Sequence, residues 1–325
     1  MKFILTLLLL LAFASNTSEG SNNEAKKLSK SEAQTIINSI GELIENHYVF
    51  VERRRPIVAR FNAEIAANPI RDDIELSEFT EEITSILREV SNDGHLYVRS
   101  LEATKNNKTW EQEERGLEDS TNYGFREIAI LDGNVGYIKI TEFMHPQRAY
   151  STAQSAMEFL NKADAMIVDL RGNPGGYGGI AELFVSWFFD PHPTHLMTTI
   201  FSDPQEAPYK LFTLPFVPTE RKSGVPTFVL IDNGTASAAE FVAYTLQAFS
   251  KATIVGSKSA GAAHRNSYFP IIHDLRLSIS TGAPMNPITK TNWENSGVIP
   301  DVEIDPSRSK EHALELAREA LSTSE

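Results

Sequence analysis

The sequence contains no cysteine among its 325 residues. Disulfide bonds, cysteine-ligated zinc, iron–sulfur clusters and thiol nucleophiles all need a sulfur atom that this chain does not have. A covalent hydrolase built on this sequence would therefore use an oxygen or nitrogen nucleophile. If the chain is exported, as argued below, its stability would come from a packed core, which favours a bacterial periplasm over a disulfide-rich secretion route.

Positive charge is scarce relative to negative charge. The chain has 30 Lys and Arg residues against 43 Asp and Glu residues, a formal net charge of −13, and its isoelectric point is about 5.2. Phosphate backbones and anionic lipid would repel it, so nucleic acid and acidic membrane surfaces are not expected partners. Its length and its 41% content of hydrophobic residues predict a globular protein of one large or two ordinary domains.

A long apolar run is also missing, apart from a short one at the start. A lysine at position 2 precedes the apolar run Phe3–Phe13, and small residues follow up to Ser15. The run is shorter than the ~20 residues that a membrane span needs, so we predict a secretory signal over residues 1–14 and no stable membrane anchor. The protein is then expected in the periplasm or the extracellular space. Residues 15–30 are polar and predict a flexible lead-in.

Residues 31–92 are predicted to form an N-terminal helical subdomain. Apolar residues recur at three- and four-residue spacing from Ala33 to Ile44 and again from Phe79 to Val90. Ser77 is the predicted N-cap of the later helix, and another helix is predicted over 57–67.

The remainder, residues 93–325, is predicted to be a catalytic core of the α/β class. Buried strands alternate with helices, which implies right-handed βαβ crossovers and a mostly parallel sheet. Strands are predicted over 135–140, 165–170, 227–231 and 252–256, and helices over 151–160, 179–189 and 238–249. The polar stretch 103–122 is too short for a domain of its own. The proline-rich segment 190–224 is predicted to be a long surface loop.

Two junctions between a strand and a helix could carry chemistry, because N–H groups at a helix start attract negative charge. The first, residues 169–179, is rich in glycine. Its Gly176-x-Gly178-x-x-Ala181 pattern weakly resembles a dinucleotide fingerprint, but five residues separate it from the strand that should lead directly into it. A glycine-rich turn without a ligand is the other interpretation.

The second junction, residues 231–240, places Ser237 at the start of the predicted helix 238–249. A serine there could be activated by a general base, with its oxyanion bound by N–H groups at the helix start. Ser237-x-x-Glu240 is equally a capping box. From this segment alone, the cap is the favoured interpretation.

A general base could come from any of eight histidines. His95 lies in a turn, where a lone histidine is usually structural or solvated. His192-x-x-His195 has a spacing that could suit a metal, but no carboxylate completes a zinc pattern and its proline-rich loop is a poor scaffold. We therefore predict no metal site and no cofactor. The competing histidines are His47, His145, His264, His273 and His312.

Taken together, several segments resemble the tail-specific, C-terminal-processing serine peptidase family, in its branch related to the tricorn core peptidase and interphotoreceptor retinoid-binding protein. They occur in the family's order and cover most of residues 31–305. The segments are Asn92–Leu96, Val168–Gly176, Thr235–Glu240, Ile254–Gly256, Gly261–His264, Asn286–Thr289 and Asn292–Asp301. Their ordered conjunction, and no single segment, makes the resemblance specific.

The resemblance implies a crotonase-like βαβ core and a Ser-His-Glu triad. Ser237 matches the family's nucleophile, His95 the histidine of the tricorn-like branch, and Glu294 its orienting carboxylate. Hydrolysis of a peptide or protein substrate would then proceed through an acyl-enzyme. The implied oxyanion donors are the backbone N–H of Ala238 and one from Gly175 or Gly176.

The processing-peptidase branch uses a Ser–Lys dyad instead, with the lysine directly after a glycine that aligns with Gly261. That position is Ala262 here, and Lys258 lies four residues before it, so a dyad would need a displaced lysine. We therefore favour Ser-His-Glu. The peptide-binding PDZ domain inserted in many processing peptidases has no room in this chain, and the sequence does not predict an oligomeric state.

Two other functions stay open. Retinoid-binding relatives use the same fold to bind lipid, so the chain could be a non-catalytic binding protein for an apolar ligand or peptide. A crotonase-like acyl-CoA enzyme would share the oxyanion hole but would not need the three triad residues to converge. The retention of all three triad candidates favours the peptidase.

Overall fold

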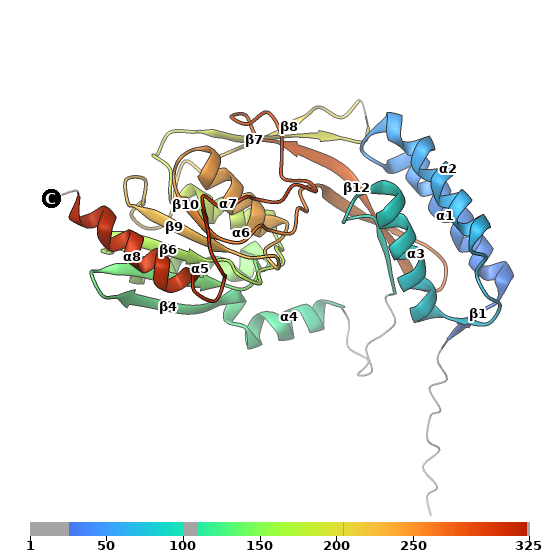
Figure 1. Ribbon diagram of the computed structural model, residues 1–325, viewed down its shortest axis with the longest axis horizontal. Helices are drawn as coiled ribbons and strands as arrows, with labels where there is room; N and C mark the ends of the chain where they lie inside the picture. Colours follow the sequence, from blue (N-terminus) through green and yellow to red (C-terminus); the bar gives the residue numbers. More distant parts are fainter. Residues whose placement is uncertain (1–25, 101–109, 204, 324–325) are drawn as a thin grey trace, which may run out of the picture.

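The computed structural model of the protein describes residues 26–100, 110–203 and 205–323 (Figure 1). The predicted signal over residues 1–14 and most of the predicted lead-in lie outside these ranges. None of the helices in the described part of the chain is long and apolar enough to cross a membrane.

The elements alternate along most of the chain. The helices are α1 (Lys30–His47), α2 (Val51–Ala67), α3 (Leu76–Ser91), α4 (Trp110–Ser120), α5 (Pro146–Phe159), α6 (Gly178–Ser186), α7 (Ala238–Ala248) and α8 (Ser309–Ser322). The strands are β1 (Lys27–Leu28), β2 (Ile74–Glu75), β3 (Tyr97–Ser100), β4 (Phe125–Leu131), β5 (Val135–Ile140), β6 (Ala165–Asp169), β7 (His195–Phe201), β8 (Tyr209–Phe212), β9 (Thr227–Ile231), β10 (Thr253–Gly256), β11 (Arg265–Pro270), β12 (Leu275–Met285) and β13 (Val302–Glu303).

A six-stranded sheet with the order β13-β10-β9-β6-β5-β4 forms the centre of the α/β unit. Every neighbouring pair is parallel except β4 with β5, which confirms the mostly parallel sheet that the sequence predicts. Both faces are covered, because Met166 and Val168 of β6 pack in the same core as α5, α6 and α7, whereas Ala165 and Ile167 pack with α8. A strand that is buried on both faces is apolar at every position, as this one is up to Asp169.

A second sheet, with the order β11-β12-β7-β8 and with β3 also paired to β12, extends from the α/β unit to the N-terminal helices (Figure 1). Leu275, Leu277 and Ile279 of β12 share a core with the apolar faces of α1, α2 and α3. The helices of residues 31–92 therefore bury their apolar faces partly against a strand from the other end of the chain. The boundary predicted after residue 92 stays a prediction.

The predicted loop over residues 190–224 is wrong over part of its length. His195–Phe201 and Tyr209–Phe212 pair antiparallel as β7 and β8. The prolines that suggested a loop all lie outside these two strands, at 191, 193, 204, 208, 215 and 218. They mark the ends of a pair of strands, which is where proline is tolerated.

Three predicted helix starts differ from the structure. The second helix begins at Val51 and contains Pro56, so it starts six residues before the predicted position. The third begins at Leu76 with Glu75 as its N-cap, and Ser77 lies inside its first turn. The helix predicted from residue 151 begins at Pro146, where a missing N–H costs nothing. Two of these helices have a proline near their N-terminus, Pro56 in α2 and Pro146 in α5, and both were predicted to begin only after that proline. Proline is tolerated in the first turn of a helix, so it does not mark the helix start.

Asp169 ends β6 and anchors the glycine-rich junction that follows it. Its buried carboxylate accepts hydrogen bonds from the Tyr137 hydroxyl (2.8 Å) and from Arg171 Nε (2.8 Å). Burial by itself would raise the pKa of Asp169, but these hydrogen bonds and the charges of Arg171 and Lys139 outweigh burial, so the pKa lies below its usual value. The ionised carboxylate is therefore the form that the fold stabilises.

Asp169→Asn is expected to lower the free energy of unfolding at neutral pH by roughly 3 kcal/mol, because it leaves the Arg171 guanidinium without its buried partner. A carboxylate whose pKa is lowered by folding stabilises the fold above its unfolded pKa, about 4, and loses that contribution as pH falls. Urea unfolding from about pH 7 to pH 3 should therefore show a steeper loss for the wild type than for Asp169→Asn. The same pH dependence in both proteins would contradict the assigned role.

Candidate active site

Ser237 lies in the turn between β9 and α7 with a strained backbone. Its φ of 49° and ψ of −116° fall in a region that side chains other than glycine rarely adopt. Strain of this kind is retained mainly at functional sites, and a sharp strand-to-helix turn is where several hydrolases hold a nucleophilic serine. The sequence could not indicate this feature, because a serine residue by itself does not predict a positive φ.

The predicted capping box is present at the start of α7, and its carboxylate has a wider role. Glu240 Oε2 accepts the backbone N–H of Ser237 at 2.9 Å. The same fully buried carboxylate also accepts hydrogen bonds from the Ser259 hydroxyl (2.5 Å) and from the backbone N–H groups of Gly261 (2.6 Å) and Ala262 (2.9 Å). Glu240 therefore ties the turn of Ser237 to the loop 259–262, a role that the capping-box pattern alone does not reveal.

The glycine-rich junction packs directly on the turn of Ser237. A Cβ atom on Gly175 would lie 2.7 Å from Ser237 Cβ and 2.9 Å from the backbone nitrogen of Ala238. The N–H of Gly175 is donated to Asn173 Oδ1 at 2.8 Å. Within the described chain, the N–H groups of Gly176 and Ala238 have no hydrogen-bond partner. Of the two glycines that the sequence left open, Gly176 is thus the one whose N–H is free in this conformation.

Gly176→Ala is expected to lower the free energy of unfolding by roughly 3 kcal/mol or more. At φ +114° an added Cβ would lie 2.1 Å from the carbonyl oxygen of Phe143, which is backbone and cannot move aside. Gly172→Ala is the matched control, because its φ of +72° is also positive but no atom lies within 4 Å of the added Cβ. The control should lose only about 1–2 kcal/mol. Urea unfolding measures both variants, and equal losses would contradict the close approach of the two segments.

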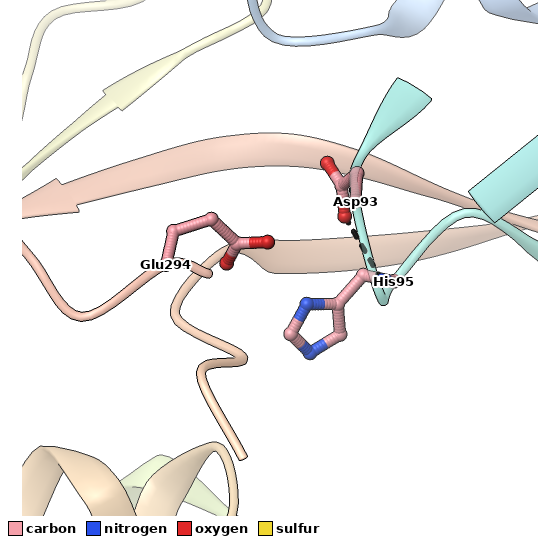
Figure 2. A group of neighbouring side chains, drawn as sticks. All are labelled: Asp93, His95 and Glu294. Carbon is pink, nitrogen blue, oxygen red and sulfur yellow. Dashed lines mark hydrogen bonds between the residues drawn. The ribbon is translucent and has the colours of Figure 1, made fainter. Parts of the chain in front are cut away.

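His95 lies close to two carboxylates, those of Asp93 and Glu294 (Figure 2). Ligand atoms of these three side chains all lie within 4.8 Å of one another. Asp93 is buried, and its Oδ1 accepts the backbone N–H of His95 at 2.9 Å. Two of the predicted triad residues, His95 and Glu294, are therefore brought together from segments about two hundred residues apart.

No hydrogen bond joins the two side chains of this predicted pair in the described structure. His95 Nδ1 and Glu294 Oε1 are both buried and both without a partner. Burial lowers the pKa of His95, in spite of the nearby charge of Asp93, so the neutral imidazole is favoured. Burial also raises the pKa of Glu294, and the charge of Asp93 acts in the same direction.

A second histidine, His264, supports this cluster. Its Nδ1 lies 2.9 Å from Asp93 Oδ2 and 3.7 Å from Glu294 Oε2. The backbone N–H groups of Ala263 (2.6 Å) and His264 (3.0 Å) donate to Glu294 Oε2, and the Tyr48 hydroxyl donates to Asp93 Oδ2 at 3.0 Å. Burial by itself would raise the pKa of Asp93. The hydrogen bond and the charge of His264 outweigh burial and lower the pKa to about 2.

The sequence did not single out Asp93 or His264 as functional. The only available indication was that both lie within segments that resemble the peptidase family, beside residues that were given a role. Their contact could not be expected from the sequence, because the two residues are 171 positions apart.

The structure does not join Ser237 to His95 by a hydrogen bond, although both residues are described. The loop 261–264 connects their surroundings: Ala262 donates to the carboxylate beside Ser237, and Ala263 donates to Glu294. The two halves of the predicted triad are thus linked through consecutive residues of one loop.

The alternative base and the alternative metal pair have other contacts. A Cβ on Gly297 would lie 3.1 Å from Lys258 Cε, so the stem of this lysine passes over Gly297, and the described structure has no hydrogen bond from Lys258 to Ser237. His195 Nε2 lies 3.0 Å from the Met197 carbonyl oxygen and 2.9 Å from Thr198 Oγ1, which leaves that nitrogen engaged within its own strand.

Comparison with protein families matches two stretches of the chain. The model described as "Peptidase family S41" matches residues 134–304. The model described as the N-terminal domain of peptidase S41 in eukaryotic IRBP matches residues 25–123. The second match covers the N-terminal helices. The first covers every strand of the six-stranded sheet except β4, together with the glycine-rich junction, Ser237 and Glu294.

Individual proteins are similar to this chain over shorter or more divergent stretches. The carboxy-terminal-processing protease of Bartonella bacilliformis is 27% identical over 203 residues, which are 59% of this chain and 44% of that protein. The chain therefore spans less than half the length of this relative. A solved lipoprotein from Streptococcus agalactiae has a TM-score of 0.60 at 15% identity, with 97% of this chain and 100% of that chain covered. The tricorn protease has a TM-score of 0.59 at 11% identity, with 90% of this chain and 37% of that chain covered. At such identities the structural likeness shows a shared fold alone.

Proposed function

This chain belongs to peptidase family S41, and on that premise we propose that it is a serine-type peptidase that hydrolyses peptide bonds through an acyl-enzyme. The observation that carries the proposal is the strained backbone of Ser237 at the start of α7, beside two unpartnered N–H groups. Backbone strain costs free energy, and a purely structural turn would not need it.

In the proposed mechanism, Ser237 Oγ attacks the carbonyl carbon of the scissile bond while His95 takes the hydroxyl proton. The carbonyl oxygen becomes an oxyanion that accepts hydrogen bonds from the N–H groups of Gly176 and Ala238. Each such donor typically contributes a factor of roughly 10²–10³ to turnover. The tetrahedral intermediate then breaks the C–N bond, and the leaving amine takes the proton from His95. Water, deprotonated by the same histidine, finally hydrolyses the acyl ester and restores Ser237.

Glu294 is proposed to orient His95. Its Oε2 is held by two backbone N–H groups, whereas its Oε1 has no partner and is free to accept a hydrogen bond from the imidazole. A modest rotation of either side chain would close this bond. Catalytic hydrogen bonds are often long in unliganded enzymes and tighten when substrate binds, so the open geometry is compatible with the role.

The substrate is proposed to be a peptide or protein, and the site of action to lie outside the cytoplasm, as the predicted signal over residues 1–14 implies. Relatives carry the name carboxy-terminal-processing protease. The six-stranded sheet with helices on both faces also supports the proposal of a crotonase-like core.

The test is covalent labelling by a fluorophosphonate probe, which reacts with activated serines. The wild type is expected to label once, at Ser237, as located by peptide mapping. His95→Ala and Glu294→Gln should label at least about a hundredfold more slowly, because the base is lost or misoriented. His192→Ala and Lys258→Ala should label at the wild-type rate. Labelling at another serine, or labelling that depends on Lys258 and not on His95, would contradict the proposed triad, and no labelling at all would favour a non-catalytic binding protein.

A further inference from the structure

Two buried polar atoms without partners, His95 Nδ1 and Glu294 Oε1, belong to side chains that lie close together (Figure 2). The side chain of Glu294 is 8% exposed and that of Asp93 is 0% exposed. An imidazole nitrogen of His95, an oxygen of Glu294 and an oxygen of Asp93 lie within 4.8 Å of one another. A buried donor or acceptor without a partner costs free energy. A bound ligand, or a hydrogen bond between the two side chains, would remove that cost.

The charge of the cluster indicates which ligand would remove that cost. Asp93 and Glu294 contribute two buried carboxylates, and His264 Nδ1 lies 2.9 Å from an oxygen of the first and 3.7 Å from an oxygen of the second. A small divalent cation would bind both unpartnered atoms and reduce the repulsion between the carboxylates.

The donor atoms select among cations. Zn²⁺ binds both imidazole nitrogen and carboxylate oxygen, whereas Mg²⁺ and Ca²⁺ prefer oxygen ligands alone. Zinc bonds to nitrogen and oxygen are about 2.0–2.2 Å long, so two ligand atoms on one ion lie at most about 4 Å apart. The ligand atoms lie within 4.8 Å of one another, so side-chain rotations that move each atom by no more than about 1 Å would bring them to zinc-binding distances.

We propose that Asp93, His95 and Glu294 form a zinc site and that zinc bound there turns the peptidase off. The ion takes the His95 nitrogen and the Glu294 oxygen that the triad needs for each other. A neutral imidazole that binds a metal through Nδ1 carries its proton on Nε2, so it cannot accept the proton of Ser237. The inhibition rests on the proposed peptidase function, whereas the binding of zinc does not.

Calorimetric titration of the purified full chain with zinc chloride tests the binding. One zinc ion per chain is expected, and affinity should fall by at least about tenfold in His95→Ala and in Glu294→Gln. Ser237→Ala should bind zinc as the wild type does, and so should His192→Ala, the control histidine from the pair that the sequence first suggested. Magnesium at the same concentrations should give no binding. Thermal unfolding of each variant without zinc checks that it is folded.

The inhibition is tested by the labelling rate of Ser237 with the fluorophosphonate probe. This rate should fall with the same zinc midpoint as binding, and a chelator should restore it. The zinc site is overturned if the wild type binds no zinc, or if neither His95→Ala nor Glu294→Gln weakens binding. Binding without any effect on labelling overturns the inhibitory role. A wild type that binds zinc but never labels would refute the proposed function and leave the zinc site standing.

Discussion

Ser237→Ala is expected to lower the rate of peptide hydrolysis by roughly 10⁴–10⁶-fold, because no other group in the proposed mechanism can form the acyl-enzyme. The oxyanion donors and the base would remain, so a residual rate above that of water is expected. The measurement is the initial rate of cleavage of an unfolded model protein such as casein. The free energy of unfolding should change little, since the backbone strain at φ 49° applies to alanine as well.

Ser237→Gly separates the catalytic role of this residue from its strain. Glycine adopts positive φ without penalty, so this variant should be as inactive as Ser237→Ala but more stable than the wild type by about 1 kcal/mol. Ser250 supplies a matched control, because it also has a positive φ (53°) but is exposed at the end of α7. Ser250→Ala should retain full activity. A Ser237→Ala enzyme with near-wild-type turnover would show that the nucleophile lies elsewhere.

Glu240→Gln is expected to lower the free energy of unfolding by roughly 2–4 kcal/mol and to slow labelling of Ser237. The buried carboxylate accepts hydrogen bonds from Ser237, Ser259, Gly261 and Ala262. An amide has the same shape, but its nitrogen donates and cannot accept, so donors that faced one oxygen lose their acceptor. The turn that holds the nucleophile would then no longer be tied to the loop that leads to Glu294.

Urea unfolding and probe labelling, measured on the same preparations, check this prediction. Glu158→Gln is the control, because Glu158 is exposed on α5 and should change stability by less than about 0.5 kcal/mol. If Glu240→Gln were as stable and as reactive as the control, the carboxylate would not be the link between the two halves of the site.

The parallel sheet could be predicted because its strands are buried on both faces. Such strands are continuous apolar runs, and Ala165–Asp169 and Thr227–Ile231 have this pattern in the sequence. The strands β7 and β8 were missed for the opposite reason: they have half-exposed patterns and are bounded by prolines, which resemble a loop. Their identity as strands comes from pairing with each other and with β12.

The candidate site divides in the same way. Ser237, His95 and Glu294 could be predicted as candidates because each lies in a short segment that resembles the family. Asp93, His264 and the wider role of Glu240 were not found, since each acts through contacts with residues that are distant in the sequence. The sequence left Gly175 and Gly176 open as oxyanion donors. Gly176 could be chosen only from the structure, because the N–H of Gly175 is hydrogen-bonded to Asn173 in the folded turn.

By itself, the sequence determined the class of chemistry open to this protein. Without cysteine a covalent hydrolase must use oxygen or nitrogen, and the order of the matching segments indicated the peptidase family to which the chain belongs. Only the tertiary structure decided which groups meet. The positive φ of Ser237 arises in the turn between β9 and α7, on which the glycine-rich junction packs. The buried cluster of Asp93, His95 and Glu294, with its two unpartnered atoms, arises where the segments that follow α3 and β12 meet. Local patterns predict local structure, but burial and partnership depend on neighbours that only folding brings into contact.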